Sequence, residues 1–263
     1  MRIKQSFCTP MFVGAGMEIG DVFREARAIG YRAAEFWDRF SLRDPDYEQV
    51  IEAAKRAGLA VASMIGHASL PDGLNKPENH DRIESELRDS IDVAVRHGIP
   101  GLICFSGNRN PDQSDLEGLV ETARGLRRIS GYAEEKGINL NVELLNSRVN
   151  HPGYQCDSTT WGVAMCEMVD TPRVKLLYDI YHMQIMEGDV VRTIQRNVRF
   201  IGHFHTAGNP DRQDLDDDQE LNYRFICKAI AATGYQGYVG HEFKPKGDPL
   251  KALQDAFTLC DQG

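Results

Sequence analysis

Residues 174–182 read VKLLYDIYH, an apolar run of strand length that leads into Asp179, with His182 three residues later. Short apolar runs of this kind are typical of fully buried strands. Asp179 and His182 therefore fall where a buried strand should end. Carboxylates and imidazoles are common metal ligands, so this stretch predicts a strand that carries chemistry at its carboxyl end.

Seven more apolar runs of strand length occur along the chain, at 2–8, 33–37, 60–67, 101–107, 139–146, 200–208 and 237–243. Helical patterns separate them. Their predicted apolar faces are formed by Val22, Phe23, Ala26 and Ile29 in 19–30, by Ile83, Leu87, Ile91 and Val95 in 78–98, and by Leu116, Leu119, Ala123, Leu126 and Tyr132 in 114–137. Several of the helical stretches end in a glycine that can adopt a left-handed cap: Gly30, Gly58, Gly98, Gly137 and Gly234.

Eight strands that alternate with helices predict an α/β fold, the (β/α)8 TIM barrel, as one domain over residues 1–263. A length of 263 residues is normal for one such barrel, and no Pro-, Gly- or Ser-rich linker divides the chain. A doubly wound open sheet is the alternative. That fold usually carries a GxGxxG phosphate loop after an early strand, and the sequence contains none.

The charge and composition of the chain indicate which kinds of partner it does not bind. A net charge of −9 repels phosphate backbones, so we expect no nucleic-acid partner. No run of about 18 apolar residues is present, and the opening MRIKQSFCTP lacks the segments of a signal peptide. Six scattered cysteines without a CxxC indicate reduced core thiols. We therefore expect a cytoplasmic protein without membrane contacts, and the sequence is compatible with a homo-oligomer.

The last four predicted strands each bring a carboxylate or an imidazole to the carboxyl end, where barrel enzymes carry their active sites. These residues are Glu143, Asp179, His205 and Glu242. His205 is preferred to His203 because it lies nearer the end of its strand. Unpaired buried charges cost several kcal/mol, and one divalent cation, Mn²⁺, Mg²⁺, Co²⁺ or Zn²⁺, would remove that cost. An ion-pair network is the alternative.

Several motifs carry a resemblance to a known family. They are NVELLN (141–146), YDIYHMQIMEGD (178–189), GHFHTAG (202–208) with NPDR (209–212), and GHEFKP (240–245). They resemble the xylose-isomerase-like sugar isomerases and epimerases, and the hydroxypyruvate isomerase family is the most similar branch. The resemblance implies a (β/α)8 barrel in which Glu143, Asp179, His205 and Glu242 hold one divalent ion and the two glutamates also move the substrate's proton.

The same resemblance implies that His182 and Arg212 bind substrate oxygens. Lys244 could hold a carboxylate or hydroxyl groups of the substrate, or it could pair with a glutamate. Two further predicted strand ends supply His67 and Trp37 as candidate substrate contacts, and Trp37 could close an apolar wall over a sugar.

These residues predict an isomerase that interconverts a small hydroxy-aldehyde and hydroxy-ketone by enediolate proton transfer between Glu143 and Glu242. The substrate would be a small sugar or a hydroxy-keto acid. A ketose 3-epimerase is one alternative, because the hydroxypyruvate branch often carries glutamine where this chain has His205. A keto-inositol dehydratase-type lyase would use the same metal and base.

Two other classes fit less well. An apurinic-site endonuclease of related fold needs more than one metal and a basic face, whereas this chain has eight histidines in all and a net charge of −9. A non-catalytic sugar-binding barrel would have no reason to retain both Glu143 and Glu242.

We predict a substrate without a phosphate group. Phosphate-binding barrels usually offer glycine-rich loops after strands seven and eight, whereas this chain has TAGNPDRQDLDDDQE (206–220) and KPKGDP (244–249) there. The acidic loop would repel a dianion, although Lys246 adds a second lysine near strand eight. The measurement is kcat/KM for matched phosphorylated and free substrates. A preference of more than about 10-fold for the phosphorylated member, about 1.4 kcal/mol, would contradict the prediction.

Overall fold

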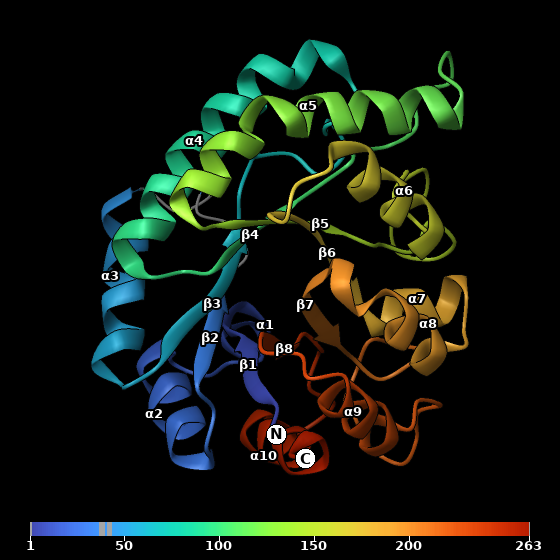
Figure 1. The fold of residues 1–263 in the computed structure, drawn as a ribbon. Helices are drawn as coiled ribbons and strands as arrows, with labels where there is room; N and C mark the ends of the chain where they lie inside the picture. The colour runs from blue at the N-terminus through green and yellow to red at the C-terminus, as the bar shows by residue number, and fades with distance from the viewer. Residues whose placement is uncertain (1, 37–39, 41–43, 263) are drawn as a thin grey trace.

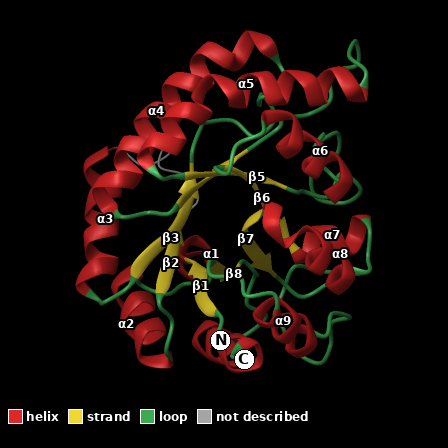
Figure 2. Cartoon of the chain, viewed as in Figure 1, coloured by secondary structure: helices red, strands yellow, loops and turns green. Residues whose placement is uncertain are grey.

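Eight parallel strands close into a barrel in chain order, and helices surround it (Figure 1; Figure 2). The structure, a computed structural model, describes residues 2–36, 40 and 44–262. The closed barrel confirms the predicted (β/α)8 architecture and excludes the open sheet. The described ends of the chain lie close together beside α10 (Figure 1).

The strands follow the eight apolar runs of the sequence. They are β1 Lys4–Cys8, β2 Ala33–Phe36, β3 Ala60–Ile65, β4 Gly101–Cys104, β5 Asn139–Glu143, β6 Val174–Asp179, β7 Ile201–Thr206 and β8 Tyr238–His241. Several are shorter than the apolar runs because the last residues of the run turn into the loop or helix that follows, as after β3, β4, β5 and β6. In the opening stretch the strand ends at Asp179, and the predicted strand residues 180–182 begin helix α7 instead.

The α-helices are α1 Thr9–Gly14, α2 Ile19–Ile29, α3 Asp44–Arg56, α4 His80–His97, α5 Asp115–Lys136, α6 Thr159–Val169, α7 Ile180–Met186, α8 Val190–Asn197, α9 Tyr223–Ala232 and α10 Pro249–Cys260. The described residues also form two 3₁₀ turns, η1 Pro77–Asn79 and η2 Val198–Phe200. In the part of the chain that the structure describes, no helix combines the length and the apolar character that crossing a bilayer requires.

The predicted glycine caps are confirmed, because all five of those glycines have a positive φ. Two predicted core residues are wrong. Val95 is 47% exposed because the buried face of α4 runs through Leu87 and Ala94, and Val95 lies one residue beyond it. Leu116 is 68% exposed in the first turn of α5. Periodicity identifies the face of a helix, but it does not show where along the helix the packing begins.

Two register shifts interrupt the regular strand pairing. One separates Ala34 from Glu35 in the pairing of β2 with β3, and the other falls at Leu176/Leu177 in the pairing of β6 with β7. After the second shift, Asp179 pairs directly with His205. The extra residues are Ala62 in β3 and Gly202 in β7. An extra residue moves the side chains that follow it in its own strand to the other face, so the second shift affects where His205 points.

Gly202 lies at the second shift, and the packing explains why it is a glycine. A Cβ atom at this position would lie 2.1 Å from Oδ1 of Asn141 in β5. No side chain fits there, so β7 can approach Asn141 closely only without one.

Tyr154 joins the ends of β4 and β5. Its ring is fully buried. The hydroxyl accepts a hydrogen bond from the backbone N–H of Ser106 at 3.1 Å and donates one to the carbonyl oxygen of Glu143 at 3.0 Å. The loop that carries Tyr154 thereby fixes the backbone of a strand-end glutamate.

We predict that Tyr154→Phe lowers the free energy of unfolding by about 1–3 kcal/mol, because it leaves a buried N–H and a buried carbonyl without their partner. Chemical denaturation measures the change. Tyr132→Phe is the matched control, since Tyr132 bonds Asp92 at the surface, and it should have a much smaller effect. An equal loss in both variants would contradict the role given to Tyr154.

Candidate active site

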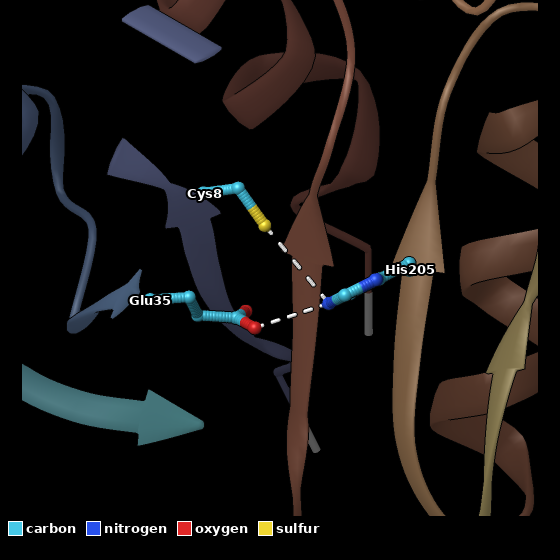
Figure 3. A group of neighbouring side chains, drawn as sticks. All are labelled: Cys8, Glu35 and His205. Atoms are coloured by element: carbon cyan, nitrogen blue, oxygen red, sulfur yellow. Dashed lines mark hydrogen bonds and ion pairs between the residues drawn. The ribbon is translucent and has the colours of Figure 1, made fainter. Parts of the chain in front are cut away.

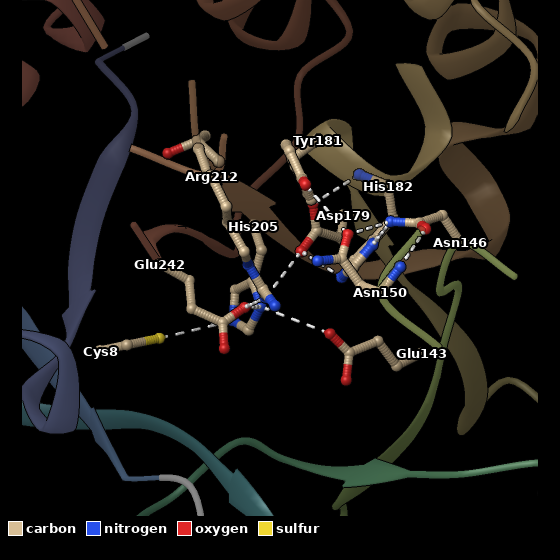
Figure 4. Close-up of polar contacts among 12 residues, drawn as sticks. Cys8, Glu143, Asn146, Asn150, Asp179, Tyr181, His182, His205, Arg212 and Glu242 are labelled. Atoms are coloured by element: carbon tan, nitrogen blue, oxygen red, sulfur yellow. Dashed lines mark hydrogen bonds and ion pairs between the residues drawn. The ribbon is translucent and has the colours of Figure 1, made fainter. Parts of the chain in front are cut away.

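Four side chains converge at the carboxyl ends of the last four strands. Glu143 ends β5, Asp179 ends β6, His205 lies in β7, and Glu242 directly follows β8. Each offers one ligand atom, and these atoms all lie within 4.8 Å of one another. The side chains point toward a common centre (Figure 4). The structure therefore brings together the four residues that the sequence singles out.

Backbone hydrogen bonding sets this arrangement. The register pairs Asp179 with His205, and the N–H of Glu242 donates to the carbonyl oxygen of Thr206 at 2.9 Å. Asp179 also caps α7, because its Oδ1 accepts a hydrogen bond from the N–H of His182 at 3.1 Å. The capping bond occupies one carboxylate oxygen and leaves Oδ2 directed at the cluster.

The chemistry of these four residues fits a divalent cation. All four side chains are buried, with residue exposures of 1–7%. Among the described residues, Oδ2 of Asp179 and Nδ1 of His205 have no partner in hydrogen-bond geometry, although Nδ1 lies 3.0 Å from Oε2 of Glu242. Unsatisfied buried polar atoms are costly, and a cation bound by carboxylate oxygens and an imidazole nitrogen would satisfy them. The cluster could therefore bind a metal ion.

Arg212 supplies positive charge to the cluster. Its Nη2 lies 2.5 Å from Oε2 of Glu242 and 3.5 Å from Oδ2 of Asp179. Its backbone has a φ of +56°, and its carbonyl oxygen accepts a hydrogen bond from the N–H of Lys244 at 2.8 Å. Arg212 is thus an ion-pair partner of the carboxylates in this structure, and it lies where it could also meet a substrate oxygen.

The protonation states reflect burial and charge together. Burial raises the pKa of Asp179 to about 7, although Arg212 opposes the shift. Burial alone would raise the pKa of Glu242, but Arg212 and His205 lower it to about 2. For His205 burial favours the neutral form, but the negative charge of Glu242 holds the imidazole pKa well above its usual value. Without a cation, the cluster therefore holds protons at neutral pH.

His182 is held as a neutral hydrogen-bond donor. Oδ1 of Asn146 accepts hydrogen bonds from the N–H groups of Val149 and Asn150, both at 2.9 Å, which fixes the orientation of the amide. Nδ2 of Asn146 therefore donates to Nδ1 of His182 at 2.6 Å. The proton of the imidazole is then on Nε2, which lies 3.6 Å from Oδ2 of Asp179 and has no hydrogen-bond partner among the described residues.

Burial also favours the neutral form of the His182 imidazole. It lowers the imidazole pKa well below its usual value, and the nearby positive charge of Arg212 adds to the shift. His182 can therefore donate a hydrogen bond to a substrate oxygen without carrying a charge.

A small cavity opens onto the cluster. Its volume is about 260 Å³. One wall is apolar and comes from β3, β4 and the loops after β3, β4 and β5: Ile65, Leu70, Ile103, Phe105 and Leu145. The other side is polar: Glu143, His151, His205, Arg212 and Glu242. A cavity of this size and lining suits a small polar molecule with a short carbon chain.

A family comparison covers most of the chain. The xylose isomerase-like TIM barrel family model matches residues 23–260. The chain belongs to the xylose isomerase-like TIM barrel family. The resemblance drawn from the sequence motifs is confirmed, and Glu143, Asp179, His205 and Glu242 all lie inside the matched range.

Relatives within this xylose isomerase-like group include isomerases. The chain is 36% identical to a 2-oxo-tetronate isomerase of Cupriavidus necator over 89% of this chain and 90% of the relative. It is 30% identical to a putative hydroxypyruvate isomerase of Danio rerio over 88% of this chain and 86% of the relative. The expectation of an isomerase is confirmed by these relatives.

A solved structure shares the fold. The apo form of 3-keto-D-glucoside 4-epimerase from E. coli superimposes with a TM-score of 0.81, at 21% identity and over 98% of both chains. At this identity the likeness shows the fold of the xylose isomerase-like barrel alone.

The remaining predicted contacts are placed differently. The side chain of Lys244 is exposed, and among the described residues it forms no ion pair with Glu143 or Glu242. His67 is fully buried, and its Nε2 accepts a hydrogen bond from the N–H of Phe105 at 2.9 Å. It therefore lies behind Phe105, which itself lines the cavity. Trp37 lies outside the described residues.

Sequence reasoning missed several residues of this site. His151 lines the cavity, and its ring lies 5.3 Å from that of His182. Glu35 hydrogen bonds to His205 from behind, and Cys8 lies beside the same ring (Figure 3). Glu35 had a signal in the sequence, because it is a single acidic residue inside a predicted buried strand. His151 had none, since it lies in a loop whose path is set by tertiary packing.

We predict that divalent-ion affinity rises with pH. Below about pH 7 the carboxyl of Asp179 is protonated in the metal-free protein, and His205 also carries a proton there. Binding must displace these protons, so Mn²⁺ should bind more tightly at about pH 7.5 than at about pH 5.5, by on the order of 10-fold or more. Titration calorimetry in two buffers of different ionisation enthalpy measures both affinity and proton release. Affinity that does not change over this range would contradict the prediction.

Proposed function

We propose that this protein is a metal-dependent isomerase that moves a carbonyl group between neighbouring carbons of a small hydroxy-keto acid or free sugar, as hydroxypyruvate isomerases do. One observation carries the proposal: Glu143 and Glu242 reach a single buried cluster from β5 and β8, together with Asp179 and His205, beside a small cavity. The isomerase relatives support the same reaction class.

Glu143, Asp179, His205 and Glu242 would hold the divalent ion. When bound, Mn²⁺, Mg²⁺, Co²⁺ or Zn²⁺ supplies positive charge that stabilises negative charge on substrate oxygens. The unsatisfied Oδ2 of Asp179 and Nδ1 of His205 support this assignment.

The two glutamates would move the proton. One carboxylate removes a proton from the carbon next to the carbonyl, which leaves an enediolate, and the other glutamate returns a proton to the neighbouring carbon. The direction of the substrate decides which glutamate acts first. Both lie at the polar side of the cavity, so both can reach a molecule bound there.

His182 and Arg212 would hold the substrate oxygens. The Nε2–H of His182 is a donor without a partner, which suits a hydroxyl or carbonyl oxygen. The guanidinium of Arg212 can turn from Glu242 toward a carboxylate or an enediolate oxygen. Lys244 is exposed and would contribute only if its loop moved inward, and His67 would act through Phe105. Trp37 remains a candidate for the apolar wall.

A ketose 3-epimerase is the second candidate function. The observation that favours it is His205, an imidazole where hydroxypyruvate isomerases often carry glutamine. An epimerase would use Glu143 and Glu242 on opposite faces of one carbon. A dehydratase-type lyase would differ by losing a hydroxyl group as water, and product analysis separates it from both.

The proposal includes the cellular compartment, the domain and the partner of the reaction. All six cysteines are free and buried, which supports a reducing compartment such as the cytoplasm. We place the whole reaction in one barrel domain over 1–263, with a small molecule as its partner. A homo-oligomer is compatible with this arrangement.

Solvent-deuterium incorporation tests the proposal most directly. Free ketoses and small hydroxy-keto acids are incubated in D₂O with the enzyme, and NMR identifies the carbon that exchanges. Exchange at the carbon next to the carbonyl, abolished by a chelator and restored by Mn²⁺, is the expected result. Exchange that survives complete removal of divalent ions would overturn the metal dependence.

We predict that Glu143→Gln and Glu242→Gln each keep the fold but lower kcat by about 10²-fold or more, because an amide keeps the shape of the side chain and cannot accept the proton. Steady-state kinetics measure kcat, and Mn²⁺ occupancy must be measured alongside, since both residues are proposed ligands. Glu135→Gln, on the exposed surface of α5, is the control. Near-normal turnover in a metal-loaded variant would remove that residue from the acid–base role.

A further inference from the structure

His205 is held from both sides of its ring. Nδ1 faces the cluster, 3.0 Å from Oε2 of Glu242 and 3.7 Å from Oε1 of Glu143. Nε2 faces the opposite way and lies 3.0 Å from Oε2 of Glu35, a residue of β2 (Figure 3). Only one nitrogen of a neutral imidazole carries a proton, so the partner of Nε2 decides what Nδ1 can do.

We propose that Glu35 is a positioning residue for the metal centre. Its carboxylate accepts the Nε2–H of His205, which leaves the lone pair of Nδ1 directed at Glu143, Asp179 and Glu242, ready to bind a divalent cation. This inference rests on the metal centre of the proposed function and adds a residue on the far side of the barrel from Glu143. Carboxylates that hold a ligating histidine in this way raise its basicity and set the plane of its ring.

The surroundings of Glu35 hold its carboxylate rigidly. The hydroxyl of Ser6 donates to Oε1, and His203 bonds Oε2 at 2.9 Å, so both oxygens are engaged by hydrogen-bond donors. Glu35 is 1% exposed. A Cβ atom at position 240 would lie 2.1 Å from Oε1, and Gly240 therefore leaves just enough room. These contacts prevent the carboxylate from turning away from His205.

A structural role alone explains this arrangement poorly. Burying a carboxylate costs several kcal/mol unless its hydrogen bonds are complete, and an apolar residue in β2 would pack the barrel at lower cost. Glu35 is the one charged side chain of β2, and it is directed inward to His203 and His205. The carboxylate of Glu35 contacts the imidazole of the cluster, His205. When Nδ1 of that ring binds a metal, Nε2 carries the proton and needs an acceptor.

A second metal site is the rival explanation. Cys8, Glu35 and His205 also offer ligand atoms within 4.8 Å of one another, and Sγ of Cys8 lies 4.0 Å from Nε2 of His205. Nε2 cannot donate a proton to Glu35 and bind a metal at the same time. The two explanations therefore predict different effects of removing the thiol.

The experiment measures Mn²⁺ binding by titration calorimetry and by EPR of free Mn²⁺, with no substrate present. Glu35→Gln should raise the Kd by about 10- to 100-fold. In His205→Gln an amide oxygen replaces Nδ1 as the ligand atom. An amide oxygen has free lone pairs whether or not Glu35 is present, so adding Glu35→Gln to His205→Gln should change the Kd by less than about 3-fold. Cys8→Ala, the control at the same ring nitrogen, should leave the Kd and a stoichiometry of about one ion per chain unchanged.

Each other outcome overturns the proposal for a stated reason. An equal effect of Glu35→Gln in both backgrounds would show a general structural role. A comparable loss in Cys8→Ala would show that the rival cluster binds the ion. Wild-type protein that binds no divalent ion would refute the metal centre of the proposed function, whereas normal binding by Glu35→Gln would refute only the positioning role.

A measurement on the wild-type chain keeps the proposal testable if Glu35→Gln does not fold. In the Zn²⁺-loaded protein, ¹⁵N NMR of the imidazoles, assigned by comparison with His205→Gln, should show His205 protonated at Nε2 and metal-bound at Nδ1. Protonation at Nδ1 with the metal on Nε2 would overturn the proposal.

Discussion

Three buried carboxylates, Glu143, Asp179 and Glu242, lie so close together that they cannot all be ionised without positive charge among them. Arg212 and the imidazolium of His205 supply part of that charge, and burial raises the pKa of Asp179, which favours its protonated form. The neighbouring residues are placed so that positive charge is supplied at one point.

Strand pairing determines where the three carboxylates lie. Each carboxylate comes from a different strand end, so the angle and register between strands determine the distances within the cluster. The shift between β6 and β7 brings Asp179 opposite His205, and Glu35 of β2 reaches the same ring from the opposite side. Tyr154 then fixes the backbone of Glu143. Small irregularities in otherwise regular strands thus have a large effect on the site.

Local pattern predicted much of this architecture. The eight strands follow from apolar runs, and Glu143, Asp179, His205 and Glu242 follow from their positions at the ends of those runs, because parallel strands of a barrel all end at the same rim. The strand predicted through His182 was too long, since the side chain of Asp179 starts a helix there. Val95 and Leu116 were misplaced because the period of a helix does not show where its contacts begin and end.

Contacts between distant parts of the chain could not be predicted in this way. Glu35 and His205 are separated by 170 residues, and neither local pattern indicates that they meet. The orientation of His182 depends on the amide of Asn146, 36 residues away, and on the backbone of the loop that follows it. Arg212 and Lys244 were both predicted as substrate contacts, yet Arg212 pairs with Glu242 in the cluster whereas Lys244 is exposed.

The two sides of the cavity come from different parts of the chain. The charged side comes mainly from β5 to β8 and the loops after them, and most of the apolar wall comes from β3, β4 and the loops that follow them. The side of the cavity that meets a carbon chain and the side that carries charge can therefore change separately. Substitutions of Ile65, Leu70 or Phe105 would alter the shape of the cavity without removing a charged side chain of the cluster.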